Sequence, residues 1–378
     1  MQSKLPHTGT TIFTIMSKMA AEHDAINLSQ GFPDFEIAPE LIDMVHHHMK
    51  AGRNQYPPMP GVPALREQIA SKIEKLYARN TDPDSEITIT TGATEGIYAT
   101  ITALVHPGDE VIIFEPAYDL YDPTIHLCGG KTVRIKMQFP DYQIPWDEVR
   151  EKVNDKTRLI IINTPHNPTG TVLTSSDMQQ LEGIVAASSA FVLCDEAYEH
   201  IVFDEAGHES MLKHPALTER GIAAFSFGKT FHATGWKMGY TVAPREVTEE
   251  IRRIHQWVNF TVNTPIQWAM ADYLKDPDHY LEVSPMYKKK RDLFQQLTKG
   301  SNLRPLKCSG TYFQLMSYES ISTLGDFDLA SKLTKESGIA SIPVSAFYDD
   351  KEDNKVLRFC FAKTDETLEK AAAIIREL

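Results

Sequence analysis

The stretch AFSFGKTFHATGWKMGY, Ala224 to Tyr240, contains the most informative residue of this chain, Lys229. An apolar run from Ile222 to Phe227 has the composition of a buried strand, and Lys229 follows it after a single glycine. An amine held at the end of a buried strand can lose its proton and attack a carbonyl carbon. The alternative is an ordinary surface lysine, and the residues after three other predicted strands argue against it.

Length and composition indicate a large globular protein. The 378 residues suggest two or three domains, and hydrophobic residues make up 42%, enough for a sizeable core. The net charge is −13 and the longest basic run is Lys288 to Arg291, so nucleic acid is a poor partner. No apolar stretch approaches the roughly 20 residues that span a bilayer, and Met1 to Gly9 is too polar for a signal peptide. We therefore expect no membrane association.

The cysteines and a histidine run do not predict a metal site. Four cysteines are scattered without the spacing of metal ligands, which predicts reduced cysteines in a cytoplasmic protein. His46, His47 and His48 are consecutive, so on a helix they point around its axis rather than to one side. We interpret them as a solvated helix face.

The middle of the chain alternates apolar strand candidates with helical stretches such as 94–104 and 175–187, the latter with Ser175 or Ser176 as its expected N-cap. Continuous apolar strands separated by helices are typical of a mainly parallel sheet that is covered on both faces. We expect a large doubly wound α/β domain over residues 40–278 with seven strands, at 87–90, 111–114, 132–135, 159–163, 191–194, 223–227 and 240–243.

The pattern changes after Asp278. A long polar helix is predicted over 279–299, followed by strands at 311–316 and 356–361 with a helix near 327–337 between them. These elements predict a smaller α+β domain of residues 1–39 plus 279–378, in which the N-terminal segment packs against the C-terminal part.

Four of the predicted strands end in residues suited to ligand binding. In open α/β sheets, ligands bind beyond the carboxyl ends of the strands. Thr91 to Thr94 forms a small-residue turn that opens a helix and suits a phosphate. Asn167 lies in a loop between two prolines, a position that a plain rigid turn explains equally well. Asp195 follows an apolar strand, where an acid is costly without a cation or strong donors.

Together with Tyr198 and Lys229, these residues are the set that a pyridoxal phosphate site needs. The lysine links to the aldehyde, the carboxylate keeps the ring nitrogen protonated, and the phenol and amide bond the ring oxygen. A dinucleotide site is the natural competitor on such a sheet, but no G-x-G-x-x-G turn follows the strand at 87–90.

With these motifs the chain resembles the class I/II, fold-type I, pyridoxal-phosphate-dependent aminotransferases, in particular the branch of the methionine aminotransferases and the kynurenine and glutamine transaminases. The resemblance runs from about Leu5 to the C-terminus. It rests on NLSQGFPDF (27–35), NQYPPMPGVPALRE (54–67), NTPHNPTG (163–170), DEAYEH (195–200), SFGKTFHATGWKMGY (226–240) and LRFCFAK (357–363).

The resemblance implies how the cofactor, pyridoxal 5'-phosphate, would be bound. Lys229 would be the Schiff-base lysine and the proton shuttle, and Asp195 would pair with the pyridine nitrogen. Tyr198 and Asn167 would contact the ring hydroxyl, and Tyr118 would stack on the ring. The phosphate would be bound by Ala93, Thr94, Ser226 and Lys237.

The resemblance also implies a substrate site and a homodimer with active sites at its interface. Arg358 would clamp the substrate carboxylate as a bidentate fork, assisted by Gly31 and Asn167. Tyr56 would reach the phosphate in the neighbouring subunit. Without the resemblance, the ordinary readings are favoured: Arg358 as a strand residue paired to a surface acid, and Tyr56 and Tyr118 as half-buried aromatics.

Two positions depart from the aspartate-type pattern. Lys237 stands where many relatives have arginine, which agrees with the kynurenine and methionine branch. Gly228 stands where many relatives have serine. The stretch 255–267 lacks the arginine that aspartate-type relatives supply, and Phe260, with Ile12, Phe13 and Tyr121, predicts an apolar pocket for a neutral side chain.

We therefore predict an aminotransferase that moves the amino group of a methionine-like or aromatic amino acid to a 2-oxo acid by a ping-pong mechanism. The alternative on the same scaffold is a cysteine-conjugate β-lyase, because the same carbanion can expel a leaving group. A transcription regulator with an aminotransferase-like domain would need a DNA-binding module before that domain, and here the resemblance begins within the first residues.

Overall fold

The structure, a computed structural model, describes residues 2–6 and 8–378. A seven-stranded sheet forms the centre of its larger part. Every pair of neighbouring strands is parallel except those of β8, which runs antiparallel to β2 and β7. Across the sheet the order is β2 (Ile87–Thr90), β8 (Gly239–Val242), β7 (Gly221–Ser226), β6 (Phe191–Asp195), β5 (Thr157–Asn163), β3 (Glu110–Glu115) and β4 (Lys131–Lys136).

These seven strands are the seven that the apolar runs predicted, with ends that agree within two residues. The mainly parallel α/β sheet is therefore confirmed. The prediction succeeds because the central strands are buried almost throughout, and such strands are apolar on both faces rather than alternating.

Helices connect and cover the strands. The N-cap of α7 is Thr174 rather than Ser175 or Ser176, because Thr174 and Asp177 form a reciprocal capping box. The helices of this part are α2 (Pro39–Lys50), α3 (Pro63–Tyr77), α4 (Gly92–Leu104), α5 (Tyr121–Leu127), α6 (Trp146–Lys152), α7 (Ser175–Ala186), α8 (Pro215–Thr218), α9 (Phe227–Thr230), α10 (Arg245–Val258), α11 (Thr264–Tyr273) and α12 (Asp278–Leu281).

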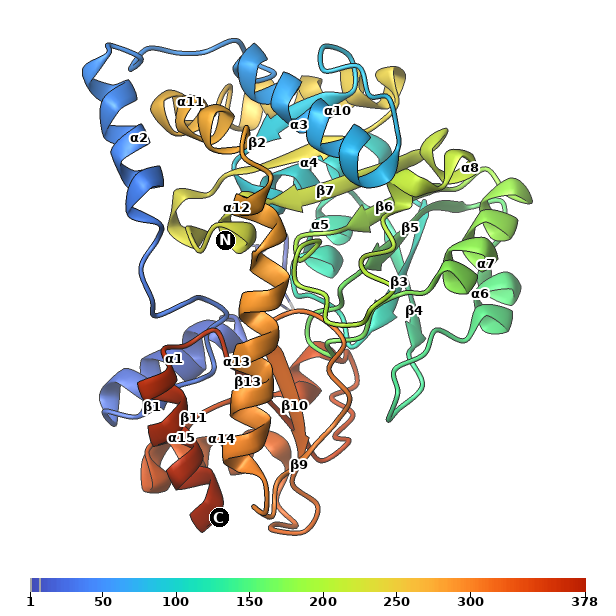
Figure 1. Cartoon of the computed structure of the whole chain (residues 1–378). Helices are drawn as coiled ribbons and strands as arrows, with labels where there is room; N and C mark the ends of the chain where they lie inside the picture. The colour runs from blue at the N-terminus through green and yellow to red at the C-terminus, as the bar shows by residue number, and fades with distance from the viewer. Residues whose placement is uncertain (1, 7) are drawn as a thin grey trace.

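The smaller part lies in the lower half of Figure 1 and contains the first and the last helix of the chain. The long helix α13 (Val283–Thr298) runs from the larger part down into it (Figure 1). Its antiparallel sheet has the order β12 (Ile342–Pro343), β13 (Val356–Cys360), β10 (Phe313–Ser317) and β9 (Arg304–Pro305). The surrounding helices are α1 (Ile12–Glu22), α14 (Asp326–Lys332) and α15 (Asp365–Glu377).

The N-terminal segment pairs with this C-terminal part. Strand β1 (Ile26–Asn27) lies parallel to β11 (Ile339–Ala340), and the amide of Cys360 donates to the carbonyl of Leu28 at 2.8 Å. Residues 28–32 are thereby placed beside the end of β13, which carries Arg358. The domain limits at 39/40 and 278/279 stay a prediction.

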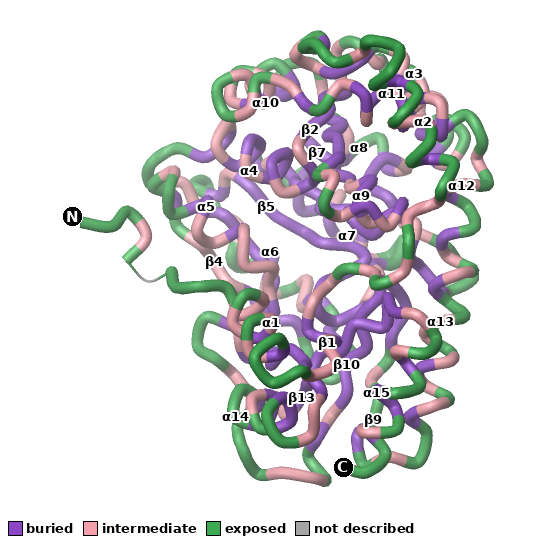
Figure 2. Tube along the Cα trace, turned by 90° about the vertical axis from the view of Figure 1, so that its left-hand side faces the viewer, coloured by how far each residue is buried: buried purple, intermediate pink, exposed green. Residues whose placement is uncertain are grey.

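Buried residues concentrate along the strands and the inner helix faces (Figure 2). His48 corrects the expected solvated histidine face: it is buried against α11, and its Nε2 lies 2.8 Å from Asp272. All four cysteines are free thiols. None of the helices in the described part of the chain combines the length and the hydropathy that a bilayer-spanning segment needs.

Candidate active site

A cavity of about 290 Å³ lies where the carboxyl ends of the central strands face the smaller part. Eleven of the thirteen predicted site residues line it, and Tyr56 and Phe260 do not. The lining residues are Gly31, Ala93, Thr94, Tyr118, Asn167, Asp195, Tyr198, Ser226, Lys229, Lys237 and Arg358, with Phe13, Phe32 and Phe313 among the apolar ones. The cavity therefore combines strand ends that are far apart in the sequence.

Lys229 extends into this cavity from α9, which begins directly after β7. Its Nζ donates to the carbonyl of Gly31 at 3.2 Å and to the hydroxyl of Tyr312 at 3.0 Å. Burial lowers the pKa of Lys229 to about 8, and the nearby cations Lys237 and Arg358 act in the same direction. A substantial fraction of this amine is therefore neutral, and able to accept a proton, at mildly alkaline pH.

Asp195 ends β6 and is buried beside the cavity. Its Oδ2 accepts from the hydroxyl of Tyr121 at 2.6 Å, and its Oδ1 accepts from the amide of Ala197 at 3.2 Å. Burial raises the pKa of Asp195 to about 6, and the two donors oppose that rise. The carboxylate is thus fixed in orientation and ionised at neutral pH.

The prediction that Tyr121 belongs to the wall of the side-chain pocket is wrong. Tyr121 is buried at the start of α5, edge-on to Tyr118, and does not line the cavity. Its hydroxyl instead orients Asp195. Ile12 likewise lies outside this cavity, whereas Phe13 lines it.

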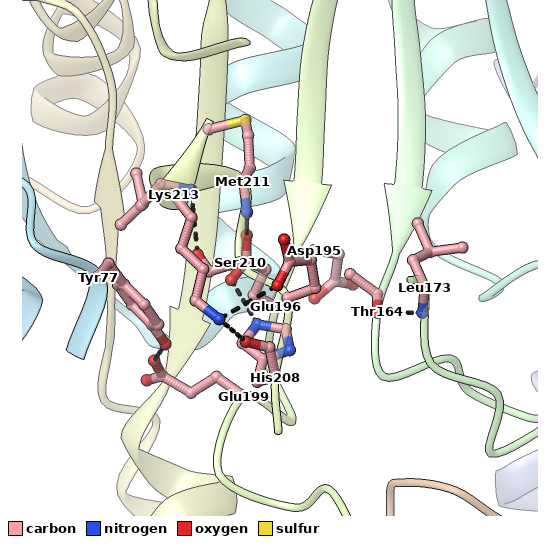
Figure 3. Close-up of polar contacts among 12 residues, drawn as sticks. Tyr77, Thr164, Leu173, Asp195, Glu196, Glu199, His208, Ser210, Met211 and Lys213 are labelled. Atoms are coloured by element: carbon pink, nitrogen blue, oxygen red, sulfur yellow. Dashed lines mark hydrogen bonds and ion pairs between the residues drawn. The ribbon is translucent and has the colours of Figure 1, made fainter. Parts of the chain in front are cut away.

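The turn that follows Asp195 is anchored by a buried polar network (Figure 3). Glu196 accepts from the amide of Met211 at 2.9 Å and lies 2.6 Å from Nε2 of His208. Glu199 accepts from the hydroxyl of Tyr77 at 2.8 Å and forms a buried ion pair with Lys72. Burial opposes ionisation of Glu199, but the Lys72 ammonium outweighs it and holds the pKa of Glu199 below its usual range. These anchors hold the backbone that carries Asp195 and Tyr198.

The N-terminus of α4 also contributes to the lining of the cavity. The N-cap, Thr91, makes no side-chain cap bond, and Ala93 and Thr94 of the first turn line the cavity. The backbone N–H groups of a first helical turn have no partner within the helix. Lys237 donates to the hydroxyl of Thr94 at 3.3 Å. Free helix N–H groups, hydroxyls and an ammonium group together suit a phosphate.

Gly239 permits this arrangement. A Cβ at Gly239 would lie 2.6 Å from the carbonyl carbon of Gly92 and 2.7 Å from the amide nitrogen of Ala93. Only glycine therefore lets β8 approach the start of α4 so closely.

Arg358 projects from β13 and is fully buried. Its guanidinium donates to Oδ1 of Asn167 at 2.7 Å and to the carbonyl of Ser29 at 2.9 Å, and it stacks on the ring of Phe313 at 3.8 Å. Its Nε has no hydrogen-bond partner, and Arg358 takes part in none of the ion pairs found among the described residues. Burial lowers the pKa of Arg358 to about 10, so it stays cationic at neutral pH. A buried, unpaired cation of this kind is suited to an anionic ligand.

Two further aromatic rings lie near the guanidinium of Arg358 and pack on each other, with centroids 5.8 Å apart. The ring centroid of Phe13, which lines the cavity, lies 5.1 Å from the guanidinium carbon, and that of Phe347 lies 5.6 Å from it. Tyr118 also lines the cavity, and burial raises the pKa of its phenol to about 12. Its hydroxyl therefore stays protonated at working pH.

Tyr56 and Phe260 lie elsewhere, on the molecular surface. Their rings pack edge to face at 5.4 Å, and 81% of Tyr56 and 49% of Phe260 are exposed. Trp257, on the same segment as Phe260, is 84% exposed. In the structure, Tyr56 and Phe260 therefore contact each other, and neither lines the cavity of its own chain.

Sequence reasoning missed Tyr312 and Phe313, which contact Lys229 and Arg358. Both lie at the start of a predicted apolar strand, where an aromatic residue is ordinary core. No local signal separates them from their neighbours, because their roles depend on residues of α9 and β13.

The residues of the cavity fit the pyridoxal phosphate that the sequence implied. The start of α4 with Ser226 and Lys237 offers a phosphate cradle, Asp195 offers an oriented carboxylate, and Lys229 offers a partly neutral amine. The unpaired Nε of Arg358 offers a further place for an anion.

Comparisons with known proteins agree with this geometry. The family model of the class I and II aminotransferases matches residues 23–375. A methionine aminotransferase of Escherichia coli is 51% identical, over all of this chain and 98% of that protein. A kynurenine–oxoglutarate transaminase of Dictyostelium discoideum is 34% identical, over 96% of this chain and 93% of that one. Among solved structures, an Escherichia coli protein described with a methionine aminotransferase function matches with a TM-score of 0.98 at 51% identity, over 100% of this chain and 99% of that one.

Proposed function

Since this chain belongs to the class I and II aminotransferases, we propose that it transfers the amino group of methionine and similar neutral amino acids to a 2-oxo acid, with pyridoxal phosphate as its cofactor. The observation that carries the proposal is the cavity itself. A partly neutral lysine amine, an oriented carboxylate and an unpaired buried arginine line the same 290 Å³ space.

Each end of the cofactor has a matching group. Ala93, Thr94, Ser226 and Lys237 would hold the phosphate, Asp195 the ring nitrogen, and Asn167 and Tyr198 the ring oxygen, with Tyr118 against the ring. When bound, pyridoxal phosphate withdraws electrons from the substrate's Cα–H bond and carries the amino group from one acid to the next. The buried network behind Glu196 and Glu199 keeps Asp195 and Tyr198 in place during this exchange.

Lys229 is the group that moves the proton. Its neutral form takes the proton from the α-carbon of the substrate, and its burial keeps that form populated near pH 8. Both acids need the same carboxylate clamp and the same amine, so they must occupy the cavity in turn. Ping-pong kinetics follow from this shared site.

Arg358 sets the position of either acid by binding its carboxylate. The groups next to it are the rings of Phe13, Phe313 and Phe347, and Arg358 is the one arginine in the lining of this cavity. A second carboxylate would find no arginine there, whereas a thioether or aromatic side chain would contact phenylalanine. This supports a preference for methionine-like over dicarboxylic substrates, as does the methionine aminotransferase at 51% identity.

We further propose that the protein is a homodimer in which Tyr56 and Phe260 complete the cavity of the partner subunit. The support is their exposure: large aromatic side chains lie uncovered at Tyr56, Trp257 and Phe260, as at an interface core. The four free cysteines support a cytoplasmic location.

The test is a spectrum of the purified holoenzyme before and after methionine is added. We expect the visible band of the bound cofactor to disappear and a 2-oxo acid to form in one equivalent per site, and a 2-oxo acid to restore the band. A substrate panel then compares methionine, phenylalanine and aspartate. A spectrum unchanged by any amino acid would refute the activity, and faster turnover of aspartate than methionine would refute the substrate class. Pyruvate and ammonia released from an S-aryl cysteine without a 2-oxo acid would instead indicate lyase chemistry.

A further inference from the structure

We propose that Tyr312 is a positioning residue for the Lys229 amine: with the carbonyl of Gly31 it forms a docking place that holds this amine, when free, ready to move the substrate proton. The inference rests on the proposed function, because it concerns the same lysine. It adds a residue that neither the motifs nor the cavity lining point to.

The three groups form a closed triangle of hydrogen bonds. Lys229 Nζ lies 3.0 Å from the hydroxyl of Tyr312 and 3.2 Å from the carbonyl oxygen of Gly31. The hydroxyl of Tyr312 donates to the same Gly31 oxygen at 2.5 Å. Since a phenol has a single proton and Tyr312 gives it to Gly31, its oxygen can only accept from Lys229.

The direction of these bonds determines what remains free on the nitrogen. A neutral primary amine has two N–H groups and one lone pair, and both N–H groups of Lys229 are engaged by Tyr312 and Gly31. The remaining tetrahedral position is then the lone pair, which can accept a proton without giving up either bond. After it has accepted, the ammonium has three donors and keeps the same two contacts.

Neutral acceptors suit this task better than a carboxylate would. An anion at hydrogen-bond distance would favour the charged form and raise the pKa of the amine. Tyr312 is buried, and burial raises the pKa of its phenol well above the usual range, so it stays a neutral acceptor. The amine is thus oriented while its burial still keeps it partly neutral.

The backbone around Tyr312 is arranged to hold the hydroxyl in place. Thr311, directly before it, has a φ of +63°, a strained value for a β-branched residue, and its amide is fixed to the carbonyl of Ile201 at 2.9 Å. The ring of Tyr312 packs against those of Tyr198 and Tyr287, with centroids 5.2 and 5.6 Å away.

Gly31 is equally constrained. A Cβ there would lie 2.8 Å from the Phe313 ring, so a side chain at this position would have to displace the ring that stacks on Arg358. The N-terminal segment therefore supplies one acceptor, and the residue directly before β10 supplies the other. Lys229 is held by residues 198 and 83 positions away in the chain.

The test compares Tyr312→Phe with Tyr287→Phe in the full-length protein. Tyr312→Phe keeps the ring and removes the acceptor. Tyr287→Phe removes a neighbouring buried hydroxyl whose partner is His232 at 3.0 Å, not Lys229. In the holoenzyme we expect Tyr312→Phe to lower kcat for methionine about tenfold or more with KM changed less than about twofold, and to raise the deuterium isotope effect with α-deuterated methionine. Tyr287→Phe should match the parent in each of these measurements.

A second measurement is independent of turnover. Competitive labelling of the cofactor-free protein with acetic anhydride, followed by peptide mapping, measures the pH at which Lys229 loses its proton. Loss of an acceptor from a buried ammonium disfavours the charged form, so this pH should fall by about one unit in Tyr312→Phe and stay unchanged in Tyr287→Phe.

The outcomes separate this inference from the proposed function. If the parent protein does not transaminate any amino acid, the proposed function fails. If the parent is active and Tyr312→Phe equals Tyr287→Phe in isotope effect and in Lys229 titration, the inference alone fails. Should Tyr312→Phe not fold, a crystal structure of the cofactor-free parent decides: a distance beyond 4 Å between Lys229 Nζ and the Tyr312 hydroxyl would refute the inference.

Discussion

Tyr121 gives the sharpest prediction about the cofactor site. Its hydroxyl donates to Asp195 at 2.6 Å and opposes the burial that raises the pKa of Asp195 to about 6. A hydrogen bond to a charged group contributes about 1.5 kcal/mol, and one pKa unit corresponds to about 1.4 kcal/mol. Tyr121→Phe should therefore raise the pKa of Asp195 by about one unit, to about 7.

A higher pKa of Asp195 should weaken cofactor binding at low pH, because only the ionised carboxylate attracts the ring nitrogen. Asp195 attracts the protonated ring nitrogen only as a carboxylate, so affinity falls as pH drops through the pKa of the free site. At a pH well below the pKa of Asp195 in the parent and in the variant, Tyr121→Phe should bind pyridoxal phosphate about tenfold more weakly than the parent. At a pH well above both values, the parent and the variant should bind it equally. The ratio of the dissociation constants of variant and parent at each pH cancels the effect of the cofactor's own ionisation.

The assay is a titration of the cofactor-free protein with pyridoxal phosphate at several pH values from 5 to 9, followed by tryptophan fluorescence. Tyr142→Phe is the matched control, because its buried hydroxyl has no hydrogen-bond partner. It should give a ratio that does not depend on pH. A ratio for Tyr121→Phe that is also flat across this range would refute the reasoning that Tyr121 tunes the ionisation of Asp195.

Three further predictions concern the proton carrier, the carboxylate clamp and the buried network. Lys229→Ala should lose all measurable transamination, whereas the control Lys275→Ala, at an exposed position, should keep it. Because the neutral Lys229 amine is the active form, kcat of the parent should rise as pH increases through about 8 and then level off. Arg358→Lys removes the planar fork and should lower kcat/KM for methionine about 30- to 150-fold, a loss of about 2–3 kcal/mol, with aldehyde-cofactor binding unchanged by absorbance. Lys72→Met leaves Glu199 buried without its cation and should lower the free energy of unfolding by about 3–5 kcal/mol in urea, whereas Lys72→Met combined with Glu199→Gln should recover part of the loss. A double variant less stable than the single one would contradict this account of the pair.

Much of the fold could be predicted because its signals are local. The central strands are continuous apolar runs, since helices cover both faces of the sheet, and each run marks its own strand. The direction of the strands then places Asp195 and the start of α4 at one edge. The N-cap of α7 was misplaced by one or two residues, because serines and threonines compete for that position and only the reciprocal bond of Thr174 with Asp177 decides.

The site could be predicted only where a residue's place in a strand implies its function. Eleven candidates meet in the cavity for that reason. Tyr121 was assigned to the pocket wall and His48 to a solvated face, because an aromatic residue or a histidine on a helix does not reveal its partner. Their partners, Asp195 and Asp272, lie 74 and 224 positions away.

The sequence by itself therefore determined which strands form, which residues end them and which family of chemistry those ends support. Only the tertiary structure decided which acceptors surround the Lys229 amine, which donor orients Asp195 and that Tyr56 lies away from the cavity of its own chain. The physical reason is the range of the forces involved. Burial patterns repeat along a few residues of chain. Hydrogen bonds such as that between Lys229 and Gly31 join residues 198 positions apart and carry no periodic signal.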